Sequence, residues 1–213
     1  MPSAPLPEQG KRNSDQTRER ILAVAFHEIY RHGFRAVSID TILSTAGITK
    51  GALYHHFSSK TALGYAVVDE LLGPKLVQSW ERVLVEMDDP IAALSVLRRK
   101  MLGVIQASVY GCPLNNLAQE MSPVDEGFRE RVSSIFERWI SLIEDGLRRG
   151  QQRGHVRRDV DPKACATFIL ASMQGGIGLA KSARSEALLN QCFAALDAYE
   201  MTLRPQDAAP SSE

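Results

Sequence analysis

The chain has 213 residues, 44% of them hydrophobic and 23% charged, and its formal net charge is zero. This composition is typical of a globular protein with one large domain or two small ones and a sizeable core. The three cysteines are far apart in sequence, which argues against a disulfide framework or a clustered zinc site and fits a reducing compartment. Neither a membrane-spanning apolar run nor a signal peptide is recognisable. We therefore expect a soluble, cytoplasmic protein.

Positive charge is concentrated toward the N-terminal end. Residues 1–60 contain eight Lys and Arg against five Asp and Glu, an excess of three, and they hold four of the five histidines. The rest of the chain has the opposite excess, with 17 basic and 20 acidic residues. This mild polarity indicates a basic end, but it does not by itself establish nucleic-acid binding.

The periodicity of apolar residues predicts helices throughout and no strands, hence an all-α fold. Residues 1–14 and 204–213 are polar and rich in proline, and we expect them to be disordered. The helix from about residue 59 is expected to bend at Gly73-Pro74. The predicted helices run, in chain order, over about 15–32, 38–46, 50–57, 59–87, 90–110, 113–121, 125–153, 161–183 and 185–203.

The motif that carries the function lies between Val37 and Lys60, where the chain reads VSIDTILSTAGITKGALYHHFSSK. Two short helices joined by a turn at Gly47 form a helix-turn-helix. In such a motif the second helix enters the major groove of DNA with its N-terminal residues toward the base edges. The sequence therefore predicts a DNA-binding unit near the N-terminus.

The residue types on the second helix suit contact with DNA. Thr49 and Lys50 lie at its N-terminus, where the amides and the helix dipole favour a phosphate. Gly51 has no side chain, so the backbone can approach DNA closely, while Leu53 and Phe57 are expected to face the core. The residues predicted to contact DNA are Ser38, Thr49, Lys50, Gly51, Tyr54, His55 and Lys60.

This region closely resembles the tetracycline-repressor (TetR) family of bacterial regulators. The resemblance covers about residues 15–72 and lies in AGITKGALYHHFSSKTAL, with RERILAVAFHEIYRHGFRAVSID before it. It implies a DNA-binding domain over residues 15–72 and a larger helical regulatory and dimerisation domain over residues 73–203. It also implies a homodimer on a near-palindromic operator and a repressor released by a small-molecule inducer. No catalytic motif is recognisable in the sequence, so we expect neither enzymatic activity nor a cofactor.

The last two predicted helices are rich in small residues, for example Ala171, Gly175 and Gly178, which allow close helix packing. We expect them to form a four-helix bundle with their two-fold mates. A pocket for a small apolar or amphipathic inducer is expected between the middle helices, lined by apolar and aromatic side chains with few polar groups. Its candidate residues, each of which could instead belong to the core, are Trp80, Met101, Tyr110, Cys112, Asn116, Trp139 and Met173.

Cys112 supports an alternative hypothesis, a redox- or electrophile-sensing regulator or a helical interaction protein switched through this thiol. It precedes Pro113 at a predicted helix start, where the helix dipole lowers a thiol pKa. The simpler interpretation, which we favour, is a small buried residue. For His55 and His56 we favour a phosphate contact by one histidine and a surface or packing role for the other over metal binding, because adjacent helix residues do not share a face.

Overall fold

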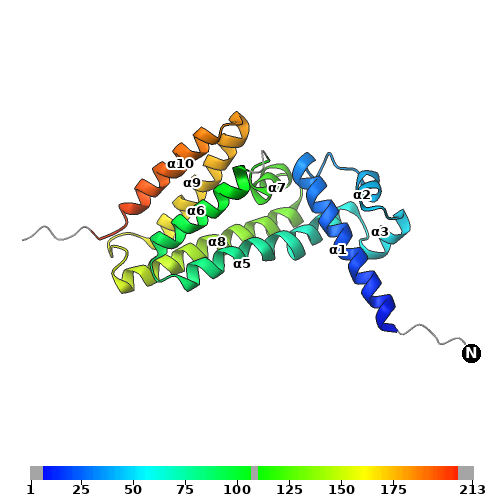
Figure 1. Ribbon diagram of the computed structural model, residues 1–213, viewed down its shortest axis with the longest axis horizontal. Helices are drawn as coiled ribbons and strands as arrows, with labels where there is room; N and C mark the ends of the chain where they lie inside the picture. Colours follow the sequence, from blue (N-terminus) through cyan, green and yellow to red (C-terminus); the bar gives the residue numbers. More distant parts are fainter. Residues whose placement is uncertain (1–6, 107–109, 206–213) are drawn as a thin grey trace, which may run out of the picture. The chain divides into compact units, whose positions relative to one another are not determined.

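The computed structural model describes residues 7–106 and 110–205, and every regular element in these ranges is helical, which confirms the predicted fold class. No helix in these ranges is long and apolar enough to cross a membrane. The elements (Figure 1) are α1 Pro7–His32, α2 Ile39–Ala46, α3 Lys50–His56, α4 Lys60–Ala66, η1 Val67–Leu72, α5 Gly73–Glu86, α6 Pro90–Gln106, α7 Pro113–Met121, α8 Glu126–Arg153, α9 Pro162–Ala183 and α10 Glu186–Met201.

The chain forms two compact units. The first, called here the N-terminal unit, comprises Met1–Pro74 and Asn116–Val132, and the second, the C-terminal unit, comprises Lys75–Asn115 and Ser133–Glu213. The chain therefore passes between the units three times, within α5, within α7 and within α8. The sequence resemblance over residues 15–72 falls inside the N-terminal unit, which in addition takes in a segment from the middle of the chain.

Two elements differ from the prediction. Helix α1 begins at Pro7 and not near residue 15, so residues 7–14, which we expected to be disordered, are helical. Proline suits the first position of a helix, and most of the polar residues that follow favour helix formation. The predicted end of α6 near Tyr110 lies partly in residues 107–109, which are outside the described ranges.

A π-helical segment, η1, joins α4 to α5 without leaving the helical conformation. The N–H of Gly73 donates to the carbonyl of Val68, five residues earlier, at the point where Pro74 follows. Proline lacks an N–H and its ring crowds the carbonyl four residues before it, and a wider helical turn relieves this crowding. The predicted long helix is thus continuous but changes its winding just before Pro74.

Aromatic side chains fill the centre of the N-terminal unit. Phe34 and Phe128 are almost fully buried and meet edge to face, with ring centroids 4.7 Å apart. A Cβ atom on Gly64 of α4 would lie 2.4 Å from the Phe34 ring and 2.7 Å from the Phe128 ring. Glycine is therefore required at this position, and the segment that contains Phe128 is part of the core of this unit.

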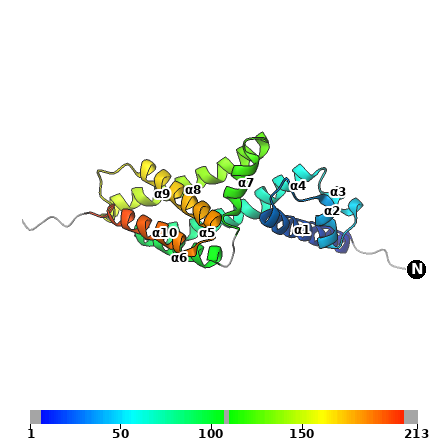
Figure 2. The ribbon, with the colours of Figure 1, turned by 90° about the horizontal axis from the view of Figure 1, so that it is seen from above.

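In the C-terminal unit, α9 and α10 lie side by side (Figures 1 and 2). A Cβ atom on Gly176 would lie only 2.9 Å from the Cβ of Cys192 on α10. The predicted role of the small residues in close helix packing is confirmed at this position. Helices α5 and α8 meet through Trp80 and Trp139, which stack with ring centroids 5.0 Å apart.

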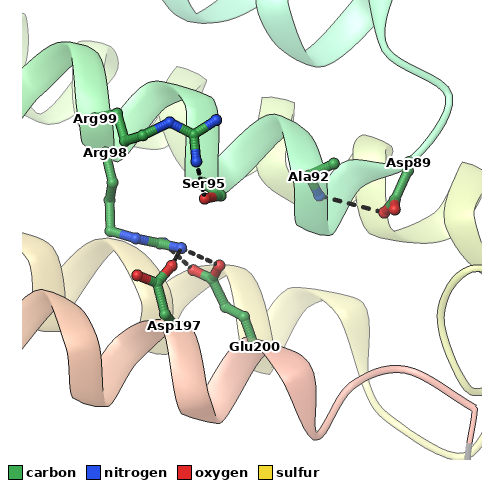
Figure 3. Close-up of polar contacts among 7 residues, drawn as sticks. All are labelled: Asp89, Ala92, Ser95, Arg98, Arg99, Asp197 and Glu200. Carbon is green, nitrogen blue, oxygen red and sulfur yellow. Dashed lines mark hydrogen bonds and ion pairs between the residues drawn. The ribbon is translucent and has the colours of Figure 1, made fainter.

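A buried ion pair links α6 to α10 in the same unit (Figure 3). The Arg98 guanidinium donates to both carboxylate oxygens of Glu200 and to Asp197. The side chains of Arg98 and Glu200 are 3% and 1% exposed, whereas that of Asp197 is 52% exposed. Burial raises the pKa of Glu200 above its usual range, and the attraction of Arg98 offsets only part of that effect.

Candidate DNA-binding site

Helices α2 and α3 form the predicted helix-turn-helix, and side chains cap both N-termini. The Ser38 hydroxyl accepts a hydrogen bond from the N–H of Thr41 at 3.0 Å, and the Thr49 hydroxyl accepts one from Ala52 at 3.2 Å. Between them Gly47 takes the left-handed conformation, with φ 61° and ψ 42°. Glycine adopts this conformation without strain, so the chain can reverse directly from one helix into the next.

Buried apolar side chains hold the recognition helix α3 in place. Leu53 is fully buried, and Phe57, which ends the helix, is 4% exposed. On α2, Ile42 and Ala46 are also buried. Leu53 and Phe57 were predicted to face the core, and both predictions are confirmed.

The opposite face of α3 is open to solvent. Thr49, Lys50, Gly51 and His55 are exposed, and Tyr54 is 43% exposed. A Cβ atom on Gly51 would meet nothing within 4 Å, so the fold itself does not require glycine there. The exposed face combines a cation, hydroxyl groups and a bare stretch of backbone at a helix N-terminus, an arrangement suited to a phosphate chain.

The two neighbouring histidines have different surroundings. His55 is exposed, whereas His56 is half-buried between the rings of His55 and Phe57. Burial lowers the pKa of His56, and the charges of His55 and Arg18 lower it further. Among the residues that the structure describes, no group of three or more His, Cys, Asp or Glu side chains is placed to hold a metal ion.

Lys60 is directed back onto its own unit. Its Nζ donates to the carbonyl oxygen of Arg35 at 3.2 Å and lies 4.9 Å from the centre of the Phe34 ring. Burial lowers the pKa of this ammonium, while the nearby Glu120 acts in the opposite direction. Lys60 was predicted to contact DNA, and the structure also gives it a role within the fold.

Two arginines of α1, which were not predicted from the sequence, support the motif. The Arg20 guanidinium donates to the carbonyl of Gly47, at the turn itself, over 3.2 Å. Arg18 forms a bidentate ion pair with Glu70 and lies over the Phe57 ring. The partners of these arginines lie 27 and 52 residues away in sequence, so local patterns contain no signal for these contacts.

All seven candidate inducer residues lie in the described part of the chain. Trp80 and Trp139 stack on each other, and Met173 and Cys112 are buried. Asn116 is assigned to the N-terminal unit, one residue beyond the boundary within α7, and the other six are assigned to the C-terminal unit. The candidates that are only half-buried are Met101, Tyr110 and Asn116.

The Cys112 thiol has a raised pKa, and the prediction that a helix dipole lowers it is wrong in direction. Cys112 is 7% exposed, so burial disfavours the thiolate. The N–H groups of Asn115 and Leu114 and the nearby Gln174 side chain offset only part of the rise. Our preferred interpretation of Cys112 as a buried residue is confirmed.

Gln174 is the buried polar side chain next to Cys112. It is 8% exposed, and neither atom of its amide makes a hydrogen bond of ordinary geometry within the described residues. An amide offers a donor and an acceptor at once, and leaving both unpaired in a protein interior costs free energy. No local sequence pattern distinguishes this glutamine from the apolar residues around it.

A separate surface pocket of about 320 Å³ lies beside the Arg98 ion pair, between α6 and α10. Its lining includes Ser95, Arg98, Asp197 and Glu200, and none of the predicted inducer residues. The charges of Arg98, Asp197 and Glu200 already satisfy one another (Figure 3). This pocket therefore has no evident connection to the predicted inducer site.

Comparison with known proteins matches both units of the chain. Residues 21–67 match the family described as bacterial regulatory proteins of the tetR family, and residues 91–196 match the tetracyclin repressor-like C-terminal domain. The HTH-type transcriptional repressor DhaR of Mycobacterium sp. (strain GP1) is 28% identical over 175 residues, which cover 82% of this chain and 87% of DhaR.

A further relative is an uncharacterized HTH-type transcriptional regulator from the lacX 3' region of Lactococcus lactis. It is 30% identical over 192 residues, covering 85% of this chain and 91% of the relative. A TetR transcriptional regulator of known structure from Chloroflexus aurantiacus superposes with a TM-score of 0.78 at 28% identity, covering 91% of this chain and 98% of the other. The chain belongs to the TetR family of DNA-binding transcriptional regulators, which are not enzymes.

Proposed function

We propose that this protein is a ligand-released repressor that binds a near-palindromic operator as a homodimer. The observation that carries the proposal is the exposed N-terminal turn of α3, whose far face is anchored by Leu53 and Phe57. Repression is suggested by the relative DhaR, which is described as a repressor. Because the operator is chromosomal in this proposal, the protein acts in the cytoplasm.

In this proposal the side chains of the exposed face of α3 and its neighbours make different kinds of contact with DNA. Lys50 and the capping hydroxyls of Ser38 and Thr49 contact phosphates, which set affinity and register. Gly51 lets the backbone approach the groove, and Tyr54 and His55 project from the next turn. Lys60 holds Arg35 from inside and adds positive charge at the start of α4.

The proposed dimer interface is the exposed face of α9 and α10. Small and apolar residues follow one side of α9 at helical spacing, and Phe168 and Leu179 on it are 50% and 58% exposed. Several residues predicted for the bundle are instead buried within the chain, so we assign the interface to the residues of α9 and α10 that are exposed. That set is Ala164, Phe168, Ala171, Gly175 and Leu179 on α9, with Ala187, Ala194, Ala198 and Met201 on α10.

The proposed inducer acts in the C-terminal unit. The unpaired amide of Gln174 beside Cys112 indicates a small molecule that carries both a donor and an acceptor. A ligand that binds better when the recognition helices are wrongly spaced must weaken DNA binding by the same factor. The apolar inducer residues proposed from the sequence are Trp80, Met101, Trp139 and Met173, with Tyr110, Cys112 and Asn116 as the polar set.

Selection of tight-binding duplexes from a random pool, followed by fluorescence anisotropy at several salt concentrations, tests DNA binding. We expect a near-palindromic selected sequence with half-sites about one turn, ~34 Å, apart. Lys50→Ala is expected to weaken binding to all duplexes and to reduce the salt slope by about one. Lys100→Ala, which removes an exposed lysine of α6, is the matched control. Equal, weak binding of selected and scrambled DNA would overturn the proposal.

The dimer is tested by light scattering during size-exclusion chromatography. The substitution Phe168→Glu is expected to shift the protein toward monomers and to weaken operator binding, because a charge is placed in an apolar contact. Val85→Glu, on an exposed apolar residue of α5, is the control. A monomeric wild-type protein at micromolar concentration would contradict the dimer.

The Cys112 switch remains the second candidate function. A buried thiol with a raised pKa reacts slowly, so such a switch needs opening of the fold or a ligand that enters beside Gln174. Cys112→Ser is expected to retain any release of DNA by peroxide or electrophiles if the simpler interpretation of the residue holds. Loss of that response would establish the switch.

A further inference from the structure

The turn between α1 and α2 is held by a carboxylate from a distant segment. The backbone N–H groups of Phe34 and Arg35 each donate to one oxygen of Glu120, both over 2.8 Å. Gly33, just before them, has a φ of +87°, and a Cβ there would lie 3.1 Å from a Glu120 oxygen. Two consecutive amides on one carboxylate form a charge-assisted contact that is stronger than an ordinary hydrogen bond.

A cation holds the same turn through its carbonyl. The Lys60 ammonium donates to the carbonyl of Arg35, and its charge is attracted to Glu120. Residues 34 and 35 are thus bound by Glu120 through their N–H groups and by Lys60 through a carbonyl. Because Lys60 begins α4, which follows α3 after three residues, the contact also fixes where the recognition helix ends.

Glu120 comes from α7, a helix that belongs to both units. Residues of α7 up to Asn115 are part of the C-terminal unit, and those from Asn116 onward are part of the N-terminal unit. The helix begins immediately after Cys112, which lies beside the unpaired Gln174. Glu120 lies near the C-terminal end of this nine-residue helix, in the part that belongs to the N-terminal unit.

A second set of contacts fixes the same segment where α8 begins. The Tyr65 hydroxyl of α4 donates to Asp125 over 2.6 Å, and Arg131 pairs with Asp69 over 2.8 Å. With Phe128 packed on Phe34, these contacts keep residues 116–132 attached to the rest of the N-terminal unit when Glu120 alone is changed. Loss of the Glu120 contact therefore changes the turn without detaching the whole segment.

We propose that Glu120 is a positioning residue for DNA binding. Glu120 does not itself contact DNA; it sets the turn before α2 and, with Lys60, the end of α3. The expected effect of Glu120 on DNA binding rests on the proposed function, whereas its expected effect on the turn does not. Removal of a negative charge near DNA strengthens binding by simple electrostatics, so weaker binding without Glu120 reports positioning.

The test uses the full chain with Glu120→Gln, which keeps the size of the side chain but lacks the second acceptor oxygen and the charge. We expect affinity for the selected duplex to fall about tenfold, as for the loss of one charge-assisted hydrogen bond, with the salt slope unchanged. Gln119→Ala, at the exposed neighbouring position of α7, is the matched control and is expected to bind like wild type.

Amide hydrogen exchange gives a readout that does not depend on DNA. In Glu120→Gln we expect faster exchange at Phe34 and Arg35 and also in α3, at Leu53 and Phe57, with the rest of the chain unchanged. Lys60→Met, which keeps the contact with the Phe34 ring, is expected to produce a smaller change in the same direction and serves if Glu120→Gln does not fold.

The outcomes separate the two proposals. Faster exchange in α3 without any DNA binding by wild type supports the positioning role and overturns the proposed function. Normal DNA binding by Glu120→Gln, or exchange that changes only at Phe34 and Arg35, overturns the positioning role and leaves the proposed function standing.

Discussion

Replacement of Arg98 by methionine is expected to destabilise the C-terminal unit by about 3–5 kcal/mol, because it leaves the Glu200 carboxylate buried without a partner. The side chain of Glu200 is 1% exposed and receives two hydrogen bonds from Arg98. Methionine retains most of the volume of the arginine stem, so the loss reports the charge and not a cavity. The net contribution of the ion pair to the free energy of unfolding is smaller than this loss, because forming the pair also requires two charges to be buried.

The neighbouring Asp197 provides a comparison within the same cluster. Its side chain is 52% exposed, and exposed ion pairs contribute about 0–1 kcal/mol. Asp197→Asn should therefore cost less than about 1 kcal/mol. The double variant Arg98→Met, Glu200→Met, which removes both buried charges, should recover most of the stability that Arg98→Met loses.

The pH dependence gives a further check with a definite sign. Burial raises the pKa of Glu200 in the folded protein, so this group favours the folded state at low pH, and that contribution is lost as the pH rises through the folded-state pKa. Without Arg98 the folded-state pKa rises further, because the offset is gone. The penalty of Arg98→Met should thus be largest near neutral pH and should shrink as the medium is acidified.

Urea unfolding followed by circular dichroism, at fixed protein concentration and at two pH values, measures these differences. The reasoning is refuted if Arg98→Met loses less than about 1 kcal/mol near neutral pH, since an uncompensated buried charge cannot be that cheap. It is equally refuted if the double variant is as unstable as the single one.

Three further predictions follow from glycine and cysteine positions. Gly51→Ala should weaken binding to the selected duplex while leaving the melting temperature unchanged or higher, because a Cβ there meets nothing in the free protein. Gly103→Ala, where a Cβ also meets nothing, should neither weaken DNA binding nor lower the melting temperature. Unchanged binding by Gly51→Ala would contradict the close approach of the backbone to DNA. Gly176→Ala should lower the free energy of thermal unfolding by about 1–3 kcal/mol, because its Cβ would meet Cys192. Gly178→Ala should not destabilise the protein, because a Cβ there meets nothing. Equal stabilities of the two variants would argue against tight α9–α10 packing. Cys112 should react with a thiol reagent at neutral pH far more slowly in the folded protein than in urea, as its raised pKa requires; equal rates would count against its burial.

The local signals in the sequence were sufficient to predict the helix-turn-helix. Ser38 and Thr49 lie where helix caps are needed, Gly47 supplies the left-handed turn, and Leu53 and Phe57 supply the buried face. Each of these features acts within a few residues along the chain, so periodicity and capping patterns reveal it. The DNA contacts themselves remain predictions.

The sequence did not reveal the contacts that act over long separations. Glu120 binds a turn 85 residues earlier, and Arg98 pairs with Glu200 102 residues later. A glutamate near the end of a short helix reads as a surface residue until the tertiary fold brings its partner to it. Burial similarly reversed the expected pKa shift of Cys112, since the helix-start argument takes no account of desolvation.

The participation of residues 116–132 in the N-terminal unit has a consequence for how the chain folds as it is made. Phe128, which is fully buried against Phe34, is synthesised long after the helix-turn-helix. A nascent chain that ends near residue 74 lacks part of its own aromatic core, so the DNA-binding end should remain only loosely folded on the ribosome. It becomes complete only when α7 and the start of α8 have emerged, so truncated products released before that point should not compete for operators.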